Sequence, residues 1–406
     1  MEQLIPRPEN LFEKKPKLKD LDVKGREIFG LEPKLEKFSK LKEGEDFKII
    51  FENKDLKTDH PLVEDFLFVN PESGDVRRLV EPPHWRASSF DGIRGVFQSG
   101  RLADYFYTSN TKGVGYLKPT LKGGRSLSSY DDWKRVDEYN RDNVYGMAGQ
   151  KDFVDTNGDN LVDKSKSLIK EGLRTECYAV IAKLTHVYYK GDRVSVAELR
   201  KKGVIVSQKD YEPEIGIRYL KINNRVAEVK EASSKRARTL FVKAFDVFNK
   251  ETQDKNLDFP VIQVGDKNSE EIYFREFFRR MGANLGIMQR SDLSLWHMHS
   301  SNITLAAEIV DIGPMASRGI EACFKDLRDA AYALKALMGA GKAQGLSVGK
   351  IEELAPIFLT AFEEKLSTRQ QKWKRAAEKI IKAALVDGKR LVSLKHGEIE
   401  AWGLDL

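Results

Sequence analysis

Asn302 and Asp311 carry oxygen ligands and stand nine residues apart, with a β-favouring stretch from Ile303 to Val310 between them. A tight hairpin across that stretch would return Asp311 to the side of Asn302, because the two arms of a hairpin run back along each other. Amide and carboxylate oxygens are hard ligands that suit Mg²⁺ bound to the phosphates of a nucleotide. The spacing therefore predicts a magnesium–nucleotide site in segment 295–314.

Two histidines, His297 and His299, precede Asn302. They raise the possibility of a transition metal, but a His-x-His pair without a third ligand nearby is a weak signal for zinc. On an extended segment both rings would face the same side. A neutral imidazole accepts a proton near pH 7, so either histidine is a candidate general base. The alternative for each is a loop histidine bonded to the backbone.

A lysine and a glutamate form a second pair of candidates. Lys112 stands beside small residues in Lys112-Gly113-Val114-Gly115, where an ammonium group can approach phosphates. Glu176 falls at the edge of an apolar face on a predicted helix, 165–184, from which a carboxylate can hold a lysine. A strand lysine beside glycines and a solvated helix acid remain the alternatives. The predicted face comprises Ile169, Leu173, Cys177, Val180 and Leu184.

The elements that must position these side chains fall into two halves. Short β-favouring stretches dominate before residue 220, and helical periodicity dominates after residue 230. This order predicts the α+β class and a bilobal protein-kinase-like fold, with a strand-rich N-lobe and a helical C-lobe. The expected strands lie at 47–51, 66–69, 104–108, 204–206 and 215–220, and the further helices at 233–251, 269–286 and 324–387, the last with breaks near 339–345 and at 388.

We expect three segments: a basic N-terminal arm at 1–45, an N-lobe at 46–230 with an insertion at 126–165, and a helical C-lobe at 231–406. The end of the insertion, from Asp155 to Lys166, resembles half of a calcium loop. Lys166 stands where such a loop needs a bidentate acid. We therefore expect an Asx-rich turn that caps the next helix, and no tight calcium site.

The run from Asn302-Ile303-Thr304-Leu305 to Asp311-Ile312-Gly313-Pro314 resembles the metal-binding segment of the selenoprotein O family. Members of that family are kinase-fold proteins that transfer AMP, not phosphate, to protein hydroxyls. The resemblance covers about residues 90–320. The other motifs that carry it are Gly100-Arg101, Lys112-Gly113-Val114-Gly115, Gly123-Gly124-Arg125, the helix motif from Glu171 to Glu176, and the pair Arg218 and Arg225, seven residues apart.

The resemblance implies an ATP-dependent adenylyltransferase that uses Mg²⁺. Its acceptor would be a hydroxyl of a protein or peptide, or another nucleophile. The implied roles are phosphate neutralisation by Lys112 with Glu176 as its partner, nucleotide binding by Gly100, Arg101, Gly124, Arg218 and Arg225, and Mg²⁺ binding by Asn302 and Asp311.

The chain departs from the family at the expected base. The family has an aspartate immediately before its metal-binding asparagine, and here Ser301 stands there. His297 occupies the place, five residues before Asn302, where ordinary kinases keep an aspartate. We therefore expect His297 or His299 to act as the base. Two alternatives stay open: a phosphotransferase on the same fold, and a catalytically dead pseudokinase acting as a partner or regulatory module, which Ser301 favours and the retained metal ligands oppose.

Composition and charge limit the partners and the cellular location that we expect for the chain. The 406 residues include 69 basic and 62 acidic side chains, which leaves a net charge of +7. The sequence contains no arginine-rich run, so nucleic acid is an unlikely partner. Two cysteines, Cys177 and Cys323, exclude a disulfide scaffold. No apolar run approaches the roughly 20 residues of a membrane span, and the first residues lack the pattern of a signal peptide. We expect a cytoplasmic protein without a membrane partner.

Overall fold

The computed structural model describes residues 39–40, 43–58, 68–69, 87–99, 102–112, 153–154, 158–189, 192–202, 214–367 and 371–387. The chain forms two compact units. The first comprises Met1–Lys164 and Cys177–Leu220, and the second comprises Ser165–Glu176 and Lys221–Leu406. The second unit thus starts ten residues before the expected boundary at 230 and also includes the short segment that ends at Glu176.

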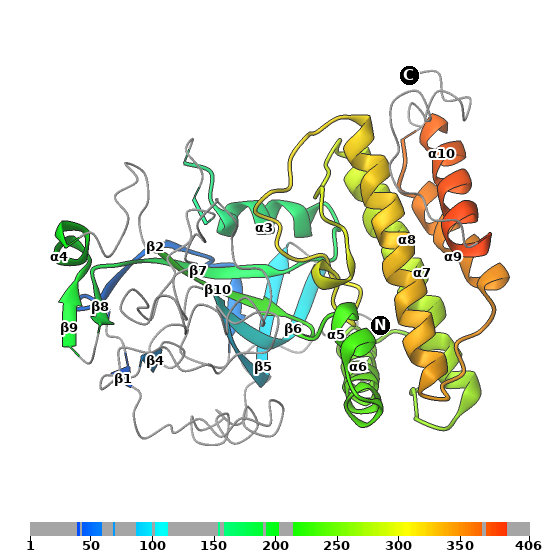
Figure 1. Ribbon diagram of the computed structural model, residues 1–406, viewed down its shortest axis with the longest axis horizontal. Coiled ribbons are helices and arrows are strands. Elements are labelled where there is room, and N and C mark those ends of the chain that lie inside the picture. The colour runs from blue at the N-terminus through cyan, green and yellow to red at the C-terminus, as the bar shows by residue number, and fades with distance from the viewer. Residues whose placement is uncertain are drawn as a thin grey trace, which may run out of the picture. The chain divides into compact units, whose positions relative to one another are not determined.

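The first unit contains a sheet of six strands in the order β2-β7-β10-β6-β5-β3, and every neighbouring pair in it is antiparallel (Figure 1). Strand β7 lies between β2 and β10, and nearly all of its residues are buried. Two glycines allow aromatic rings to pack on the sheet: Gly95 faces Tyr219, and Gly216 faces Phe153. The strands are β2 (Phe47–Glu52), β3 (Leu56–Thr58), β5 (Ala87–Ser99), β6 (Leu102–Lys112), β7 (Cys177–Leu184) and β10 (Glu214–Leu220).

Smaller elements accompany this sheet in the first unit. Strands β1 (Ser39–Lys40) and β4 (Phe68–Val69) pair with each other. Strands β8 (His186–Tyr189) and β9 (Asp192–Ser195) form a second hairpin, which α4 (Val196–Lys201) follows.

Helix α3 (Leu161–Lys170) is much shorter than the helix that we expected at 165–184, and that prediction is wrong. Gly172 adopts a φ of +92°, a left-handed conformation that commonly ends helices. The chain then extends into β7, whose residues pair with two neighbouring strands. The apolar residues that we assigned to one face of a single helix therefore extend from a helix into the buried strand that follows it.

The start of α3 bears out the expected capping turn. Asn160 Oδ1 accepts a hydrogen bond of 2.9 Å from the backbone N–H of Asp163. Asn160 Nδ2 in turn donates to Asp163 Oδ2 over 2.9 Å. These contacts use Asn160 as an N-cap. Residues 155–157, at the start of the calcium-like sequence, lie outside the described residues.

Helices dominate the second unit (Figure 1). Aromatic rings of α6 and α7 pack together, among them Phe241 against Tyr273 at 6.5 Å between ring centroids. Helices α7 and α9 approach each other so closely that side chains at Gly282 and Gly286 would overlap the carbonyl oxygens of Phe358 and Phe362. The helices are α5 (Val226–Glu231), α6 (Ser234–Asp254), α7 (Lys267–Arg290), α8 (Ile320–Ala343), α9 (Ile351–Glu363) and α10 (Gln371–Ile381), which a π-helical turn, Lys382–Val386, extends.

The mixed α+β class predicted from the sequence is confirmed. The strands expected at 47–51, 104–108 and 215–220 and the helices expected at 233–251 and 269–286 are present. The long helical stretch is interrupted at 344–350, close to the expected break, and a second time after Glu363, where no break was predicted. No helix in the described ranges is both long and apolar enough to cross a membrane. The predicted strand at 204–206, the insertion up to residue 152, the helical break at 388 and most of the arm at 1–45 lie outside the described residues.

Candidate metal centre

The hairpin predicted between Asn302 and Asp311 is present in the second unit. Asn302 ends a one-turn 3-10 helix, Ser300–Asn302, and its carbonyl oxygen accepts a hydrogen bond of 3.0 Å from the N–H of Val310. Ile303 and Ile309 form an antiparallel bridge inside this contact. The fold therefore returns Asp311 to the neighbourhood of Asn302, as the nine-residue spacing predicted.

Hydrogen bonding fixes the orientation of the Asn302 amide. Its Nδ2 donates to the carbonyl oxygen of His297 over 2.9 Å, and its backbone N–H donates to the carbonyl oxygen of His299 over 2.8 Å. Because the side-chain nitrogen is the donor, Oδ1 is the atom left to accept. Within the described part of the chain, no hydrogen bond is made to this oxygen. Asn302 thus presents the oxygen that a magnesium ligand requires.

Asp311 adopts a strained backbone conformation. Its φ is +61°, in the left-handed region that few non-glycine residues occupy. Hydrogen bonds on both sides hold it there: Val310 N–H donates to Asn302, and Ile312 N–H donates to Glu176 Oε1 over 3.0 Å. Such strain costs about 1–3 kcal/mol and concentrates at functional sites.

Glu176 is completely buried. Contrary to our prediction it does not lie on a helix, because α3 ends at Lys170. Its carboxylate instead anchors the backbone that follows Asp311. Lys112, its expected partner, is the last residue of β6, where it pairs with Ala87 and Gly216 in the first unit. The pairing of Lys112 with Glu176 stays a prediction.

Side chains from α7 and from the segment before β7 bind the backbone of the hairpin. Thr175 Oγ1 donates to Ile309 O over 2.5 Å, and Tyr273 Oη donates to Leu305 O over 2.7 Å. Burial raises the pKa of Tyr273, so its hydroxyl stays a donor. Further bonds run from Arg174 Nε to Ala306 O at 2.7 Å and from Asn284 Nδ2 to Ala307 O at 2.9 Å.

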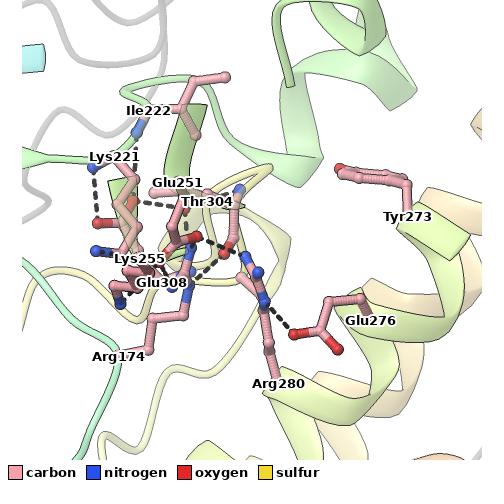
Figure 2. Close-up of polar contacts among 12 residues, drawn as sticks. Arg174, Lys221, Ile222, Glu251, Lys255, Tyr273, Glu276, Arg280, Thr304 and Glu308 are labelled. Atoms are coloured by element: carbon pink, nitrogen blue, oxygen red, sulfur yellow. Dashed lines mark hydrogen bonds and ion pairs between the residues drawn. The ribbon is translucent and has the colours of Figure 1, made fainter. Parts of the chain in front are cut away.

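Glu308, near the tip of the hairpin, reinforces this attachment. Its carboxylate is buried and accepts hydrogen bonds from Lys221 N–H at 2.8 Å and Thr304 Oγ1 at 3.0 Å (Figure 2). Burial raises the pKa of Glu308, and the nearby Lys221 and Arg174 offset part of that effect. The hairpin is therefore held by polar contacts along its whole length.

A buried ionic cluster lies beside the hairpin and is centred on Glu251 of α6 (Figure 2). Its carboxylate pairs with both terminal nitrogens of Arg174 at 2.5 Å and with Arg280 Nη1 at 2.9 Å. Lys255 Nζ lies 3.0 Å and Lys221 Nζ 3.6 Å from Glu251 Oε1. Burial alone would raise the pKa of Glu251, but the surrounding cations hold it well below its usual value.

The two histidines are exposed, and their ring centroids lie 6.1 Å apart. Partial desolvation lowers the pKa of His297, and Lys325 lowers it further. Partial desolvation and then the neighbouring His297 lower the pKa of His299, whereas Asp329 and Asp311 act in the opposite direction. Both shifts favour the neutral form of the ring.

Asp326 of α8 anchors the start of the histidine segment, a role that we did not predict. Its Oδ2 accepts hydrogen bonds from Ser294 Oγ and Leu295 N–H, both at 2.7 Å, and from Trp296 N–H at 3.3 Å. Trp296 has a φ of +66°, and Lys325 Nζ lies 5.3 Å from the centre of its ring. In the sequence Asp326 is one acid of a charged helical run, and nothing in that run distinguishes it.

The two arginines predicted to contact the nucleotide, Arg218 and Arg225, belong to different units. Arg218 is buried in β10 of the first unit, where its Nε donates to Asn110 Oδ1 over 2.8 Å. Arg225 belongs to the second unit and is buried at the start of α5, where its backbone N–H donates to Glu228 Oε1 over 2.7 Å. The implied phosphate contacts of both stay predictions. Gly100, Arg101 and Gly124 lie outside the described residues.

In the described ranges, no group of three or more His, Cys, Asp or Glu side chains is arranged to hold a metal ion. No protein-family model matches the chain, and a search of curated proteins finds no match. The resemblance to the selenoprotein O family rests on the sequence motifs alone.

Proposed function

We propose that this chain is a Mg²⁺-dependent ATP-binding transferase with a kinase-like fold, and that it moves AMP to a hydroxyl group of a protein or peptide. The observation that carries the proposal is the left-handed conformation of Asp311, maintained opposite Asn302 by bonds on both of its sides. A backbone strain that several contacts enforce is expected where a side chain must be aimed at a ligand.

The proposed roles follow from the donors and acceptors present. Asn302 Oδ1 and the Asp311 carboxylate would hold Mg²⁺, which would supply charge neutralisation at the phosphates of ATP. Glu176 and Asp326 would act as positioning residues, because each binds the backbone next to a candidate site residue. His297 or His299 would accept the proton of the acceptor hydroxyl as its oxygen bonds to the α-phosphorus and pyrophosphate leaves.

The deciding experiment incubates the chain, with its own hydroxyls and a mixture of hydroxyl-bearing peptides as acceptors, with ATP labelled at either the α or the γ phosphate. Retained α label supports AMP transfer, and retained γ label indicates a phosphotransferase. Binding of Mg²⁺–ATP without either label indicates a pseudokinase.

The metal assignment has a matched test of its own. Asp311→Ala should abolish both labels and the Mg²⁺-dependent part of ATP binding, because it removes a fixed charge from the metal. Asp258→Ala, at an exposed aspartate outside the hairpin, should change neither. Transfer by the Asp311 variant at the wild-type rate would overturn the assignment.

A further inference from the structure

Two histidines that look equivalent in the sequence differ in the structure. The backbone N–H of Ser301 donates a hydrogen bond of 3.3 Å to Nδ1 of His299, inside the turn that opens the 3-10 helix at Ser300. For His297, the described residues make no hydrogen bond to either ring nitrogen. Its contact with Asn302 uses the backbone oxygen alone.

The bond from Ser301 selects one tautomer of His299. A ring nitrogen that accepts a hydrogen bond carries no proton, so the proton of the neutral ring must reside on Nε2. Before Nε2 of the neutral ring could accept a proton, it would have to lose its own, with a proton moving to Nδ1 and breaking the bond from Ser301. The ring is therefore prepared to donate and is poorly prepared to accept.

We propose that His299 is the neutral hydrogen-bond donor of this site, acting through Nε2–H on a phosphate oxygen of the bound nucleotide, and that the general base is His297. The choice of phosphate rests on the proposed function, whereas the tautomer does not. Phosphate oxygens only accept hydrogen bonds, so they match a ring that only donates. Ser301, in the place of the missing aspartate, then contributes its backbone N–H, which orients His299.

The tautomer can be measured without any activity. In protein labelled with ¹⁵N-histidine at about pH 8, where a histidine ring is neutral, two-bond ¹H–¹⁵N spectra report which ring nitrogen carries the proton. His299→Gln assigns the signals by their loss. We expect an unprotonated Nδ1 and a protonated Nε2 for His299. A protonated Nδ1 would overturn the proposal.

Three variants test the donor. In His299→Gln, the side-chain amide nitrogen reaches the position of Nε2 and cannot act as a base, whereas in His299→Asn the amide nitrogen reaches only the position of Nδ1. We expect His299→Gln to keep Mg²⁺–ATP affinity within about threefold, and His299→Asn and His299→Ala to lose roughly tenfold, the value of one hydrogen bond. Equal losses in all three variants, or none, would overturn the donor role.

The base is tested separately, in the same preparations. His297→Ala should lower the AMP-transfer rate by roughly 10²–10⁴-fold at unchanged ATP affinity, the loss expected for a general base. A normal rate in that variant would overturn the assignment to His297. If the wild type fails to bind Mg²⁺–ATP, the proposed function fails, and the NMR experiment still decides the tautomer of His299.

Discussion

The carboxylate of Glu176 accepts a hydrogen bond of 3.0 Å from the backbone N–H of Ile312, the residue that follows Asp311. The two residues are far apart in the sequence, and both are buried. The contact fixes one side of the strained residue, and the bond from Val310 to Asn302 fixes the other. Glu176 therefore acts on the candidate metal centre through the backbone.

Replacing Glu176 should separate this backbone role from a general effect of charge. Glu176→Gln keeps an oxygen that can accept from Ile312, and we expect a small loss of stability. Glu176→Ala leaves the buried N–H of Ile312 unsatisfied, which should cost about 1–3 kcal/mol and weaken Mg²⁺ binding in parallel. Urea denaturation and Mg²⁺ titration calorimetry measure the two effects. Equal behaviour of the two variants would contradict the backbone role.

Asp311→Gly should make the protein more stable while destroying its metal binding. Glycine adopts a positive φ without steric cost, so the substitution should release about 1 kcal/mol of strain. It also removes the only carboxylate among the two proposed ligands. Thermal unfolding and Mg²⁺-dependent ATP binding give the two readings.

Asn256→Gly provides the matched control for Asp311→Gly. Asn256 has a φ of +49° and is exposed just after the end of α6, outside the hairpin. The control should not lower the melting temperature and should leave Mg²⁺–ATP binding unchanged. If Asp311→Gly is clearly less stable than the wild type, the φ of Asp311 is not a source of strain.

Local patterns in the sequence were sufficient to predict the hairpin. Asn302, a β-favouring run and Asp311 lie within ten residues, and the contacts that close the hairpin form inside that stretch. The helix expected at 165–184 failed because the decisive interactions are not local. The strand that replaces it is specified by pairing with β2 and β10, which are distant in the sequence.

The polar contacts that hold the hairpin could not be predicted from the sequence for the same reason. Arg174, Lys221 and Glu251 are separated by tens of residues, and each resembles an ordinary surface charge in the sequence. Only the fold brings them together in a buried position. The same holds for Asp326, whose partners Leu295 and Trp296 lie 31 and 30 residues before it in the sequence.

Helix packing offers a prediction about stability that is independent of the site. A side chain at Gly282 of α7 would overlap the carbonyl oxygen of Phe358 in α9. We expect Gly282→Ala to destabilise the chain by about 1–3 kcal/mol, the usual cost of overpacking. Gly339→Ala in α8 is the control, because nothing lies within 4 Å of an added Cβ there. That change should stabilise the helix by about 0.5–1 kcal/mol. Urea denaturation compares the two, and a stable Gly282 variant would contradict the packing.

Two buried glutamates should affect stability with opposite dependences on pH. The cations around Glu251 lower its folded-state pKa from the ordinary 4.5. Its stabilising effect is therefore complete above about pH 4.5 and is lost as the pH falls through the folded-state pKa. Removing this buried charge leaves cations unpaired, so Glu251→Gln should cost about 3–5 kcal/mol at neutral pH. That difference from the wild type should shrink as the solution becomes acidic.

Glu308 supplies the opposite case in the same unit. Burial raises its folded-state pKa above 4.5, so the unfolded chain loses this proton before the folded chain does. The contribution of Glu308 is complete below about pH 4.5 and is lost as the pH rises through the folded-state pKa. Relative to Glu308→Gln, which cannot ionise, the wild type should lose stability with rising pH. Urea denaturation of the three proteins between about pH 3.5 and 7 measures both differences. Parallel slopes for the two variants would show that the cations around Glu251 do not control its ionisation.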